Sequence, residues 1–197
     1  MDAVSMSTVV FADREAVFEF LRDFEGYGKY SEHVRDVDVN GDGDVGTEYA
    51  ITFGWWKLTY TARSRVVDVD PPSSIRWEIV KDVDAHGQWR LEALDLDADR
   101  DEIDDPVPSD ATAATRVSID VSFDAGSVGS DALDLPLFVS LDWVLERAKP
   151  LVAQQAGQVL RRVVADLEGR ERTPALHVHE TPDSVDVDRD DLDVSGN

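Results

Sequence analysis

Few side chains in this sequence are placed to transfer protons in a buried site. His33 follows a predicted short helix and His86 lies beside a predicted turn, so we expect both to be exposed. An enclosed acid–base site needs at least one inward-facing group with an adjusted pKa. The acidic residues of the central strands fall on the outward-facing positions: Glu48, Glu78 and Glu92. The best remaining candidates are Tyr49, Tyr60 and His86, so the sequence favours binding over catalysis and assigns no catalytic residue.

Two short motifs resemble metal-binding sequences. Residues 38–44 (Asp-Val-Asn-Gly-Asp-Gly-Asp) match the first half of an EF-hand loop, including the glycine at the sixth place. The twelfth place is Tyr49 rather than Glu, and strands are predicted on both sides, so a hairpin turn explains the motif better. Residues 177–180 (His-Val-His-Glu) could hold a metal, but no fixed geometry is expected there. Cysteine is absent, which excludes thiolate ligands and disulfides. We predict neither a metal nor a cofactor.

Between Thr47 and Phe123, apolar and polar residues alternate with the period of two that half-buried antiparallel strands require. This alternation places most large aromatic side chains on one face, which a C-terminal helix can cover. Because ligand pockets are mostly apolar with a few polar groups, a curved sheet lined in this way predicts a cavity. Ser64 and Gln155 could contact a ligand there, although a core hydrogen bond explains each of them better. The expected ligand-binding residues are Tyr49, Phe53, Trp56, Tyr60, Ser64, Trp77, Trp89, Phe123 and Gln155.

The elements that must position this face follow in a simple order. A first strand is followed by two short helices, six antiparallel strands and one long helix that a proline should kink. The predicted bounds are 4–11 for the strand, 13–21 and 23–30 for the short helices, 34–39 for the next strand, and 135 to about 167 for the long helix, with the kink at Pro150. This order indicates an α+β, helix-grip fold, in which a curved antiparallel sheet wraps around the long C-terminal helix.

Three segments carry a resemblance to a known family: residues 18–27 (FEFLRDFEGY), 49–60 (YAITFGWWKLTY) and 69–77 (VDPPSSIRW). They resemble the START-like (SRPBCC) superfamily, and within it the polyketide cyclase/dehydrase and coenzyme Q-binding-protein branch, over about Val4 to Glu168. The resemblance implies a hydrophobic ligand such as an isoprenoid quinone or a lipid. It also leaves two alternatives open: a cyclase or dehydrase acting on an aromatic or polyketide-type substrate, and a module that associates with ribosomes or other proteins. The shared motifs mark the fold rather than a reaction.

The charge balance is the strongest signal in the composition. Asp and Glu number 42 against 19 Lys and Arg, which gives a formal net charge of −23. The even spread of Asp through the loops favours adaptation to concentrated salt, of the haloarchaeal type, over a basic partner. Near 1 M salt the Debye length is only about 3 Å, so self-repulsion is largely screened. The sequence contains no cluster of basic residues that could contact nucleic-acid phosphates. We therefore expect a hydrophobic small molecule as the partner and no nucleic acid, and the oligomeric state stays open.

The chain length of 197 residues predicts one domain. The composition adds two acidic segments to it. We expect the domain to span residues 1–169 and to contain a solvated hairpin insertion at about 95–113. Residues 170–197 are rich in Asp, Val, Ser and Thr, so we expect a disordered tail outside the fold. No run approaches the roughly 18 apolar residues of a membrane span, and the first residues lack the features of a signal peptide. A cytoplasmic protein is the resulting expectation.

Overall fold

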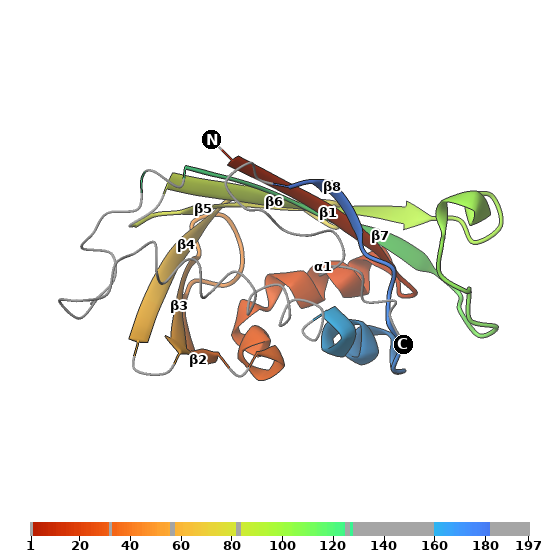
Figure 1. Ribbon diagram of the computed structural model, residues 1–197, viewed down its shortest axis with the longest axis horizontal. Helices are drawn as coiled ribbons and strands as arrows, with labels where there is room; N and C mark the ends of the chain where they lie inside the picture. Colours follow the sequence, from red (N-terminus) through yellow and green to blue (C-terminus); the bar gives the residue numbers. More distant parts are fainter. Residues whose placement is uncertain are drawn as a thin grey trace.

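In the computed structural model, eight strands form one sheet, and α1 and the helical residues 160–168 lie on the same side of it (Figure 1). The structure describes residues 2–31, 33–55, 58–81, 84–124, 127 and 160–181. The strands are β1 (Asp2–Val10), β2 (Val34–Asn40), β3 (Glu48–Trp55), β4 (Leu58–Asp70), β5 (Ser74–Ile79), β6 (Asp84–Leu94), β7 (Ala114–Asp124) and β8 (His177–Glu180). The helices are α1 (Arg14–Arg22), η1 (Phe24–Tyr30) and η2 (Arg100–Glu102). The α+β, helix-grip prediction is confirmed.

The strand order across the sheet is β2-β3-β4-β5-β6-β7-β1-β8, and every neighbouring pair is antiparallel. Strands β2 to β7 therefore follow one another as hairpins, while β1 pairs with the far side of β7. The turn between β2 and β3 contains residues 41–46, so the EF-hand-like motif is part of a hairpin, as the sequence indicated. Gly41 and Gly43 have positive φ angles there, a conformation that glycine adopts without steric cost.

The two faces of the sheet differ as the alternating pattern predicts. The face toward α1 and residues 160–168, called the inner face below, carries the apolar positions of each strand. The opposite, outer face carries arginines paired with carboxylates on adjacent strands, such as Arg90 with Asp120 and Arg76 with Asp68. Because successive side chains point to opposite sides of a strand, a one-residue change of register would exchange these two faces.

α1 begins where the extended backbone of Asp13 ends, and Glu15 in its first turn suits the positive end of the helix dipole. Its buried residues, Val17, Phe18 and Leu21, face the sheet. The chain then turns at Asp23, whose carboxylate accepts a hydrogen bond from the backbone N–H of Gly26 at 3.4 Å. The main core lies between these helices and the inner face. Its buried members are Val10, Val17, Phe18, Leu21, Tyr49, Val66, Ile75, Leu91, Val117 and Val164.

The acidic insertion is less solvated than the sequence indicated. Ile103 is only 3% exposed and packs with Val9, Phe11, Leu94 and Ala114 in a second apolar cluster. Val9 alternates with the inner-facing Val10, so the insertion covers the outer face at this end of the sheet. The expectation of a free hairpin at 95–113 is wrong for this part, because its few apolar residues are enough to anchor it.

The chain beyond Gly169 also differs from the expected disordered tail. Residues 170–176 run back along the domain, and β8 adds an edge strand beside β1 (Figure 1). The expected boundary at Gly169 is therefore too early, because residues 170–181 make backbone and ionic contacts that composition alone does not reveal. Residues 182–197 and the predicted helix between 135 and 159, with its kink at Pro150, lie outside the described residues. None of the described helices is long and apolar enough to span a membrane.

Candidate functional site: an apolar cavity under the C-terminal helix

A cavity of about 280 Å³ lies between the inner face of the sheet, α1 and the helical residues 160–168. Its walls come from β1, β6 and β7, from both of these helical segments, and from the chain just before β8. The lining residues are Met6, Ser7, Thr8, Val10, Val17, Phe20, Leu21, Trp89, Val117, Ile119, Leu160, Val163, Val164, Leu167 and Leu176. Of the predicted ligand-binding residues, Trp89 belongs to this lining.

Two rows of cross-strand neighbours form the sheet side of this cavity. In one row Met6 lies opposite Ile119, which lies opposite Trp89. In the next row Thr8 lies opposite Val117. The other side is a helical stripe: Leu160, Val163, Val164 and Leu167 follow the i, i+3, i+4, i+7 spacing of one helix face.

The polar content of the cavity is low. Ser7 and Thr8 are the only hydroxyl-bearing residues among the described lining residues, and both have partners on the C-terminal segment. The Thr8 hydroxyl donates to the Ala175 carbonyl oxygen at 2.7 Å, and the Ser7 Oγ lies 2.8 Å from the His179 Nε2. No Asp, Glu, His, Lys or Arg belongs to the described lining. This arrangement can hold an apolar body by burial, and it offers no charged group from the described residues for acid–base chemistry.

Two tryptophans of the inner face are arranged by the register of β5 and β6, and of these Trp89 belongs to the described cavity lining. Trp77 lies opposite Gly87, and its indole ring fills the space that a Cβ atom at Gly87 would need. Trp89 lies two residues after Gly87 on the same face of β6. It is half-buried and lines the cavity. Among the described residues, neither indole N–H has a hydrogen-bond acceptor, although both nitrogen atoms are buried. Buried indole N–H groups usually find a partner, so a ligand with an acceptor oxygen suits Trp89, which lines the cavity.

The remaining predicted site residues are distributed over and beyond the inner face. Tyr49 and Ser64 are buried opposite one another on β3 and β4, outside the described cavity lining. Phe123 is half-buried near the end of β7. Phe53, near the end of β3, is 38% exposed, more than expected. Three further predictions, Trp56, Gln155 and the side chain of Tyr60, lie outside the described residues.

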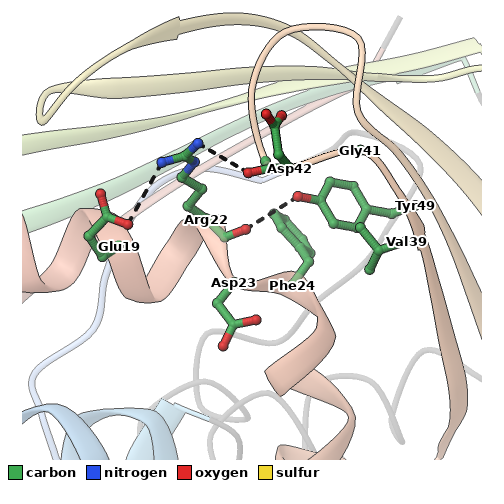
Figure 2. A pocket seen from close by; sticks show the side chains of 9 residues that line it. Glu19, Arg22, Asp23, Phe24, Val39, Gly41, Asp42 and Tyr49 are labelled. Carbon is green, nitrogen blue, oxygen red and sulfur yellow. Dashed lines mark hydrogen bonds and ion pairs between the residues drawn. The ribbon is translucent and has the colours of Figure 1, made fainter.

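Tyr49 belongs to a second hollow, of about 270 Å³, between the end of α1 and the β2–β3 turn (Figure 2). Its hydroxyl donates to the Arg22 carbonyl oxygen at 3.2 Å, and its ring lies 4.8 Å from that of Phe24. The Arg22 guanidinium donates to the Asp42 carbonyl oxygen and to the Asp44 carboxylate. Burial raises the pKa of the Tyr49 hydroxyl, which keeps it protonated. Tyr49 therefore joins α1 to the β2–β3 turn, and its engaged hydroxyl is poorly placed for proton transfer.

None of the described histidines belongs to the cavity lining. His86 is exposed on β6, as expected, whereas His33 is half-buried beside the start of β2. His177 and His179 contact Asp104 and Ser7, respectively. Among the described residues, no three metal-ligating side chains come together, and the turn at residues 41–46 is held by hydrogen bonds such as that from the Gly43 N–H to the Thr47 hydroxyl.

A polar latch fixes the helical residues 160–168 over the cavity. The Tyr30 hydroxyl and the Lys29 ammonium both donate to one carboxylate oxygen of Asp166, at 2.5 Å and 2.8 Å. The Arg162 guanidinium donates to the Tyr30 carbonyl oxygen at 2.9 Å. These donors lower the pKa of the Asp166 carboxyl, Lys29 foremost. The latch links η1 to the helical residues 160–168, and this link helps to hold that wall of the cavity in position.

Several lining residues were not among the predicted site residues. Val117 and Ile119 belong to the segment predicted to alternate, and Val163 and Leu167 to the predicted C-terminal helix, so only their contact with the cavity was missed. Leu176 was missed entirely, because it lies in a segment whose composition indicated disorder. A single leucine among charged and polar residues gives no sequence pattern that would predict its contact with the cavity.

Comparison with known proteins places this geometry in a family. Residues 1–168 match the model of the family described as polyketide cyclase/dehydrase and lipid transport. Among solved structures, the chain resembles the Zhui aromatase/cyclase from a Streptomyces species, with a TM-score of 0.52 at 20% identity over 84% of this chain and 93% of that one.

Two further structures are less similar. A Deinococcus radiodurans protein has a TM-score of 0.43 at 16% identity, over 61% of this chain and 82% of that one. The di-domain aromatase/cyclase StfQ of the steffimycin pathway has a TM-score of 0.49 at 10% identity, over 85% of this chain and 51% of that one. No curated protein matches the chain. Because the family model covers most of the sequence, the chain belongs to the polyketide cyclase/dehydrase and lipid transport family, with a START-like fold.

Proposed function

We propose that this protein binds or carries a hydrophobic small molecule, such as an isoprenoid quinone or a lipid-like compound, in the cavity between the sheet and the C-terminal helix. The observation that carries this proposal is the lining itself: thirteen of its fifteen described residues are apolar, and the hydroxyls of the other two are bonded elsewhere. Burying apolar surface contributes about 25 cal/mol per Å², so an apolar ligand gains affinity here without any charged contact.

The dimensions and the free donors narrow the ligand further. About 280 Å³ is at the small end of ligand pockets, so the described cavity suits one ring or a short stretch of chain. The Trp89 indole N–H lacks an acceptor among the described residues and could donate to a carbonyl oxygen of that ring. A quinone head group combines both features, which is why it is our preferred example.

The second candidate is an enzyme of the cyclase or dehydrase class acting on an aromatic or polyketide-type substrate. The family and the likeness to an aromatase/cyclase of 20% identity support it. Such chemistry needs an acid or base at the cavity, and the described lining contains no carboxylate, imidazole or amine. Binding without reaction is therefore the better-supported proposal.

Fluorescence of N-phenyl-1-naphthylamine, a neutral apolar probe, tests the binding proposal. Wild-type protein should enhance the probe's emission, and decylubiquinone should displace it. Ile119→Trp fills the cavity from β7 and should weaken probe binding about tenfold or more, because the probe loses buried apolar contact. The matched control is Val67→Trp, which adds the same side chain at an exposed position of β4.

The outcomes separate binding from catalysis. No probe binding by wild type, or equal binding by the Ile119→Trp and wild-type proteins, would contradict the proposal. Turnover of a model polyketide thioester, followed by mass spectrometry of the product, would instead favour the enzyme.

We also propose that the protein works inside the cell in concentrated salt. The net charge of −23 supports this setting, because its self-repulsion is screened only at high ionic strength. Thermal melts from 0.1 to 3 M KCl should show a rising midpoint, and a flat response would contradict the proposal.

A further inference from the structure

The C-terminal strap, defined as residues 169–181, lies beyond the part of the chain that the family model matches, which ends at residue 168. It leaves the helix at Gly169, whose positive φ angle reverses the chain, and ends in β8 (Figure 1). The strap thus lies outside the residues on which the family match rests. Because the strap runs beside β1, it reaches the part of the cavity that β1 lines.

A buried ion cluster at Arg172 fixes the first half of the strap. The Arg172 guanidinium contacts the Glu168 carboxylate at 2.6 Å and the Asp105 carboxylate at 2.8 Å, and donates to the Val9 carbonyl oxygen at 2.6 Å. Glu168 also accepts a hydrogen bond from the backbone N–H of Phe11 at 3.0 Å. The Glu168 side chain is fully buried, and those of Arg172 and Asp105 are nearly so. The cluster therefore ties the strap to β1 and to the acidic insertion at once.

The second half of the strap is fixed on both sides of Leu176. Before it, Ala175 accepts a hydrogen bond from the Thr8 hydroxyl and donates its backbone N–H to the Asp105 carboxylate at 3.1 Å. After it, His177 and Val178 pair with Ser7 and Met6 of β1. Leu176 itself is half-buried and lines the cavity. A side chain held in this way forms a fixed end wall rather than a mobile flap.

We infer that Leu176 determines ligand size in this cavity, by closing the end that the strap crosses. This inference rests on the proposed function. The wall comes from outside the family-matched residues, so relatives without a strap would have this end built differently or left open. Leu176→Ala removes the end of the wall and leaves the anchors at Arg172, Ala175 and β8 in place. The freed space extends the cavity along the strap.

The expected effect can be stated for n-alkanols, which differ only in chain length. Each additional methylene that becomes buried improves affinity about fourfold. Room for two more methylenes in Leu176→Ala should therefore improve binding of the longest alcohols that enter by roughly fifteenfold. It should also move the length of strongest binding to a longer alcohol. Leu176→Phe should move that length to a shorter alcohol, because the larger ring enters the same space.

The experiment is displacement of N-phenyl-1-naphthylamine by hexanol to hexadecanol, in full-length wild type and variants whose melting temperatures are recorded alongside. The control is Val178→Ala, a similar truncation in the same strap at a residue that does not line the cavity. Opposite shifts for Leu176→Ala and Leu176→Phe, with none for Val178→Ala, support the inference. An unchanged length profile in a folded Leu176→Phe or Leu176→Ala protein overturns it and leaves the proposed function standing. Absence of probe binding by wild type overturns the proposed function, and this inference with it.

Discussion

Two regions of this molecule use the same kind of ion pair in different surroundings. On the outer face of the sheet, Arg90 contacts Asp120 at 2.6 Å, and their side chains are 58% and 37% exposed. At the strap, Arg172 contacts Glu168 at the same distance, but these side chains are 15% and 0% exposed. The outer-face pair joins adjacent strands that already share backbone hydrogen bonds, whereas the strap cluster joins segments far apart in the sequence.

This difference shows that the distance between the charged atoms does not by itself determine how much an ion pair contributes to stability. Exposed pairs contribute about 0–1 kcal/mol, because water and salt screen them and the long side chains lose freedom. Removing one partner from a buried cluster costs about 3–5 kcal/mol, because a desolvated charge is left alone. The acidic chain thus has many pairs of small individual effect and one cluster on which the position of the strap depends.

The largest effect should follow from removing the strap. A chain ending at Gly169 lacks Arg172 and β8, so Glu168 and Asp105 lose their shared cation and β1 loses its outer neighbour. We expect a greater loss in the free energy of unfolding than any single substitution below produces. Urea denaturation followed by circular dichroism measures it, with a chain ending at Thr181 as the control. Equal stability of the two chains would show that the strap only rests on the domain.

The next effect isolates the buried cation. Arg172→Met keeps the length of the side chain and removes its charge, so the Glu168 and Asp105 carboxylates stay close together without compensation. The free energy of unfolding should fall by about 3–5 kcal/mol. A control with Glu168→Gln, Asp105→Asn and Arg172→Met together should recover part of this loss, since no buried charge is then left unpaired. A loss below about 1 kcal/mol would place the cluster with the exposed pairs.

The latch between η1 and the helix should contribute less than the buried cluster, because its charged side chains are largely exposed, and its contribution should depend on pH. Lys29 and Tyr30 lower the pKa of Asp166 in the folded protein, so the folded state holds that proton less readily than the unfolded one. The stabilisation is complete above the unfolded pKa of about 4 and is lost as the pH falls through the folded pKa. The difference in unfolding free energy between wild type and Asp166→Asn should be constant from pH 7 to 5 and shrink toward pH 3. A difference that persists at pH 3 would contradict this assignment.

The sequence predicts regions whose positions follow one repeating rule. The inner face, the helical stripe at Val163 and Leu167, and the hairpin at residues 41–46 all follow from alternation, helical spacing or turn residues. The inner-face positions of Trp77 and of the cavity-lining Trp89 follow as well, because a period of two fixes which side each residue faces. The Trp77 ring packs against Gly87, and a glycine within a strand signals such a close approach.

The strap and the insertion could not be predicted in this way. Arg172, Glu168 and Asp105 are three charged residues among many, and nothing local distinguishes them from solvated ones. These residues become buried only when segments that are distant in the sequence pack together. Burying each charge is then possible because opposite charges are buried beside it. Leu176 was missed for the same reason, since its contact with the cavity exists only once the cluster has placed the strap.

The smallest effect sharpens the comparison most directly. Arg90→Met on the outer face should lower the unfolding free energy by about 0–1 kcal/mol in dilute buffer, because the pair is exposed and screened by water. At 1 M KCl the Debye length is about 3 Å, so this loss should vanish, while the loss in Arg172→Met should persist because salt does not enter the buried cluster. Chemical denaturation in urea at 0.1 and 1 M KCl measures both differences, each relative to wild type in the same salt, so the general effect of the net charge cancels. If the two variants respond to salt alike, the strap cluster is accessible to solvent and the distinction between the two regions fails. If only Arg90→Met responds, burial rather than distance decides what an ion pair contributes in this highly acidic chain.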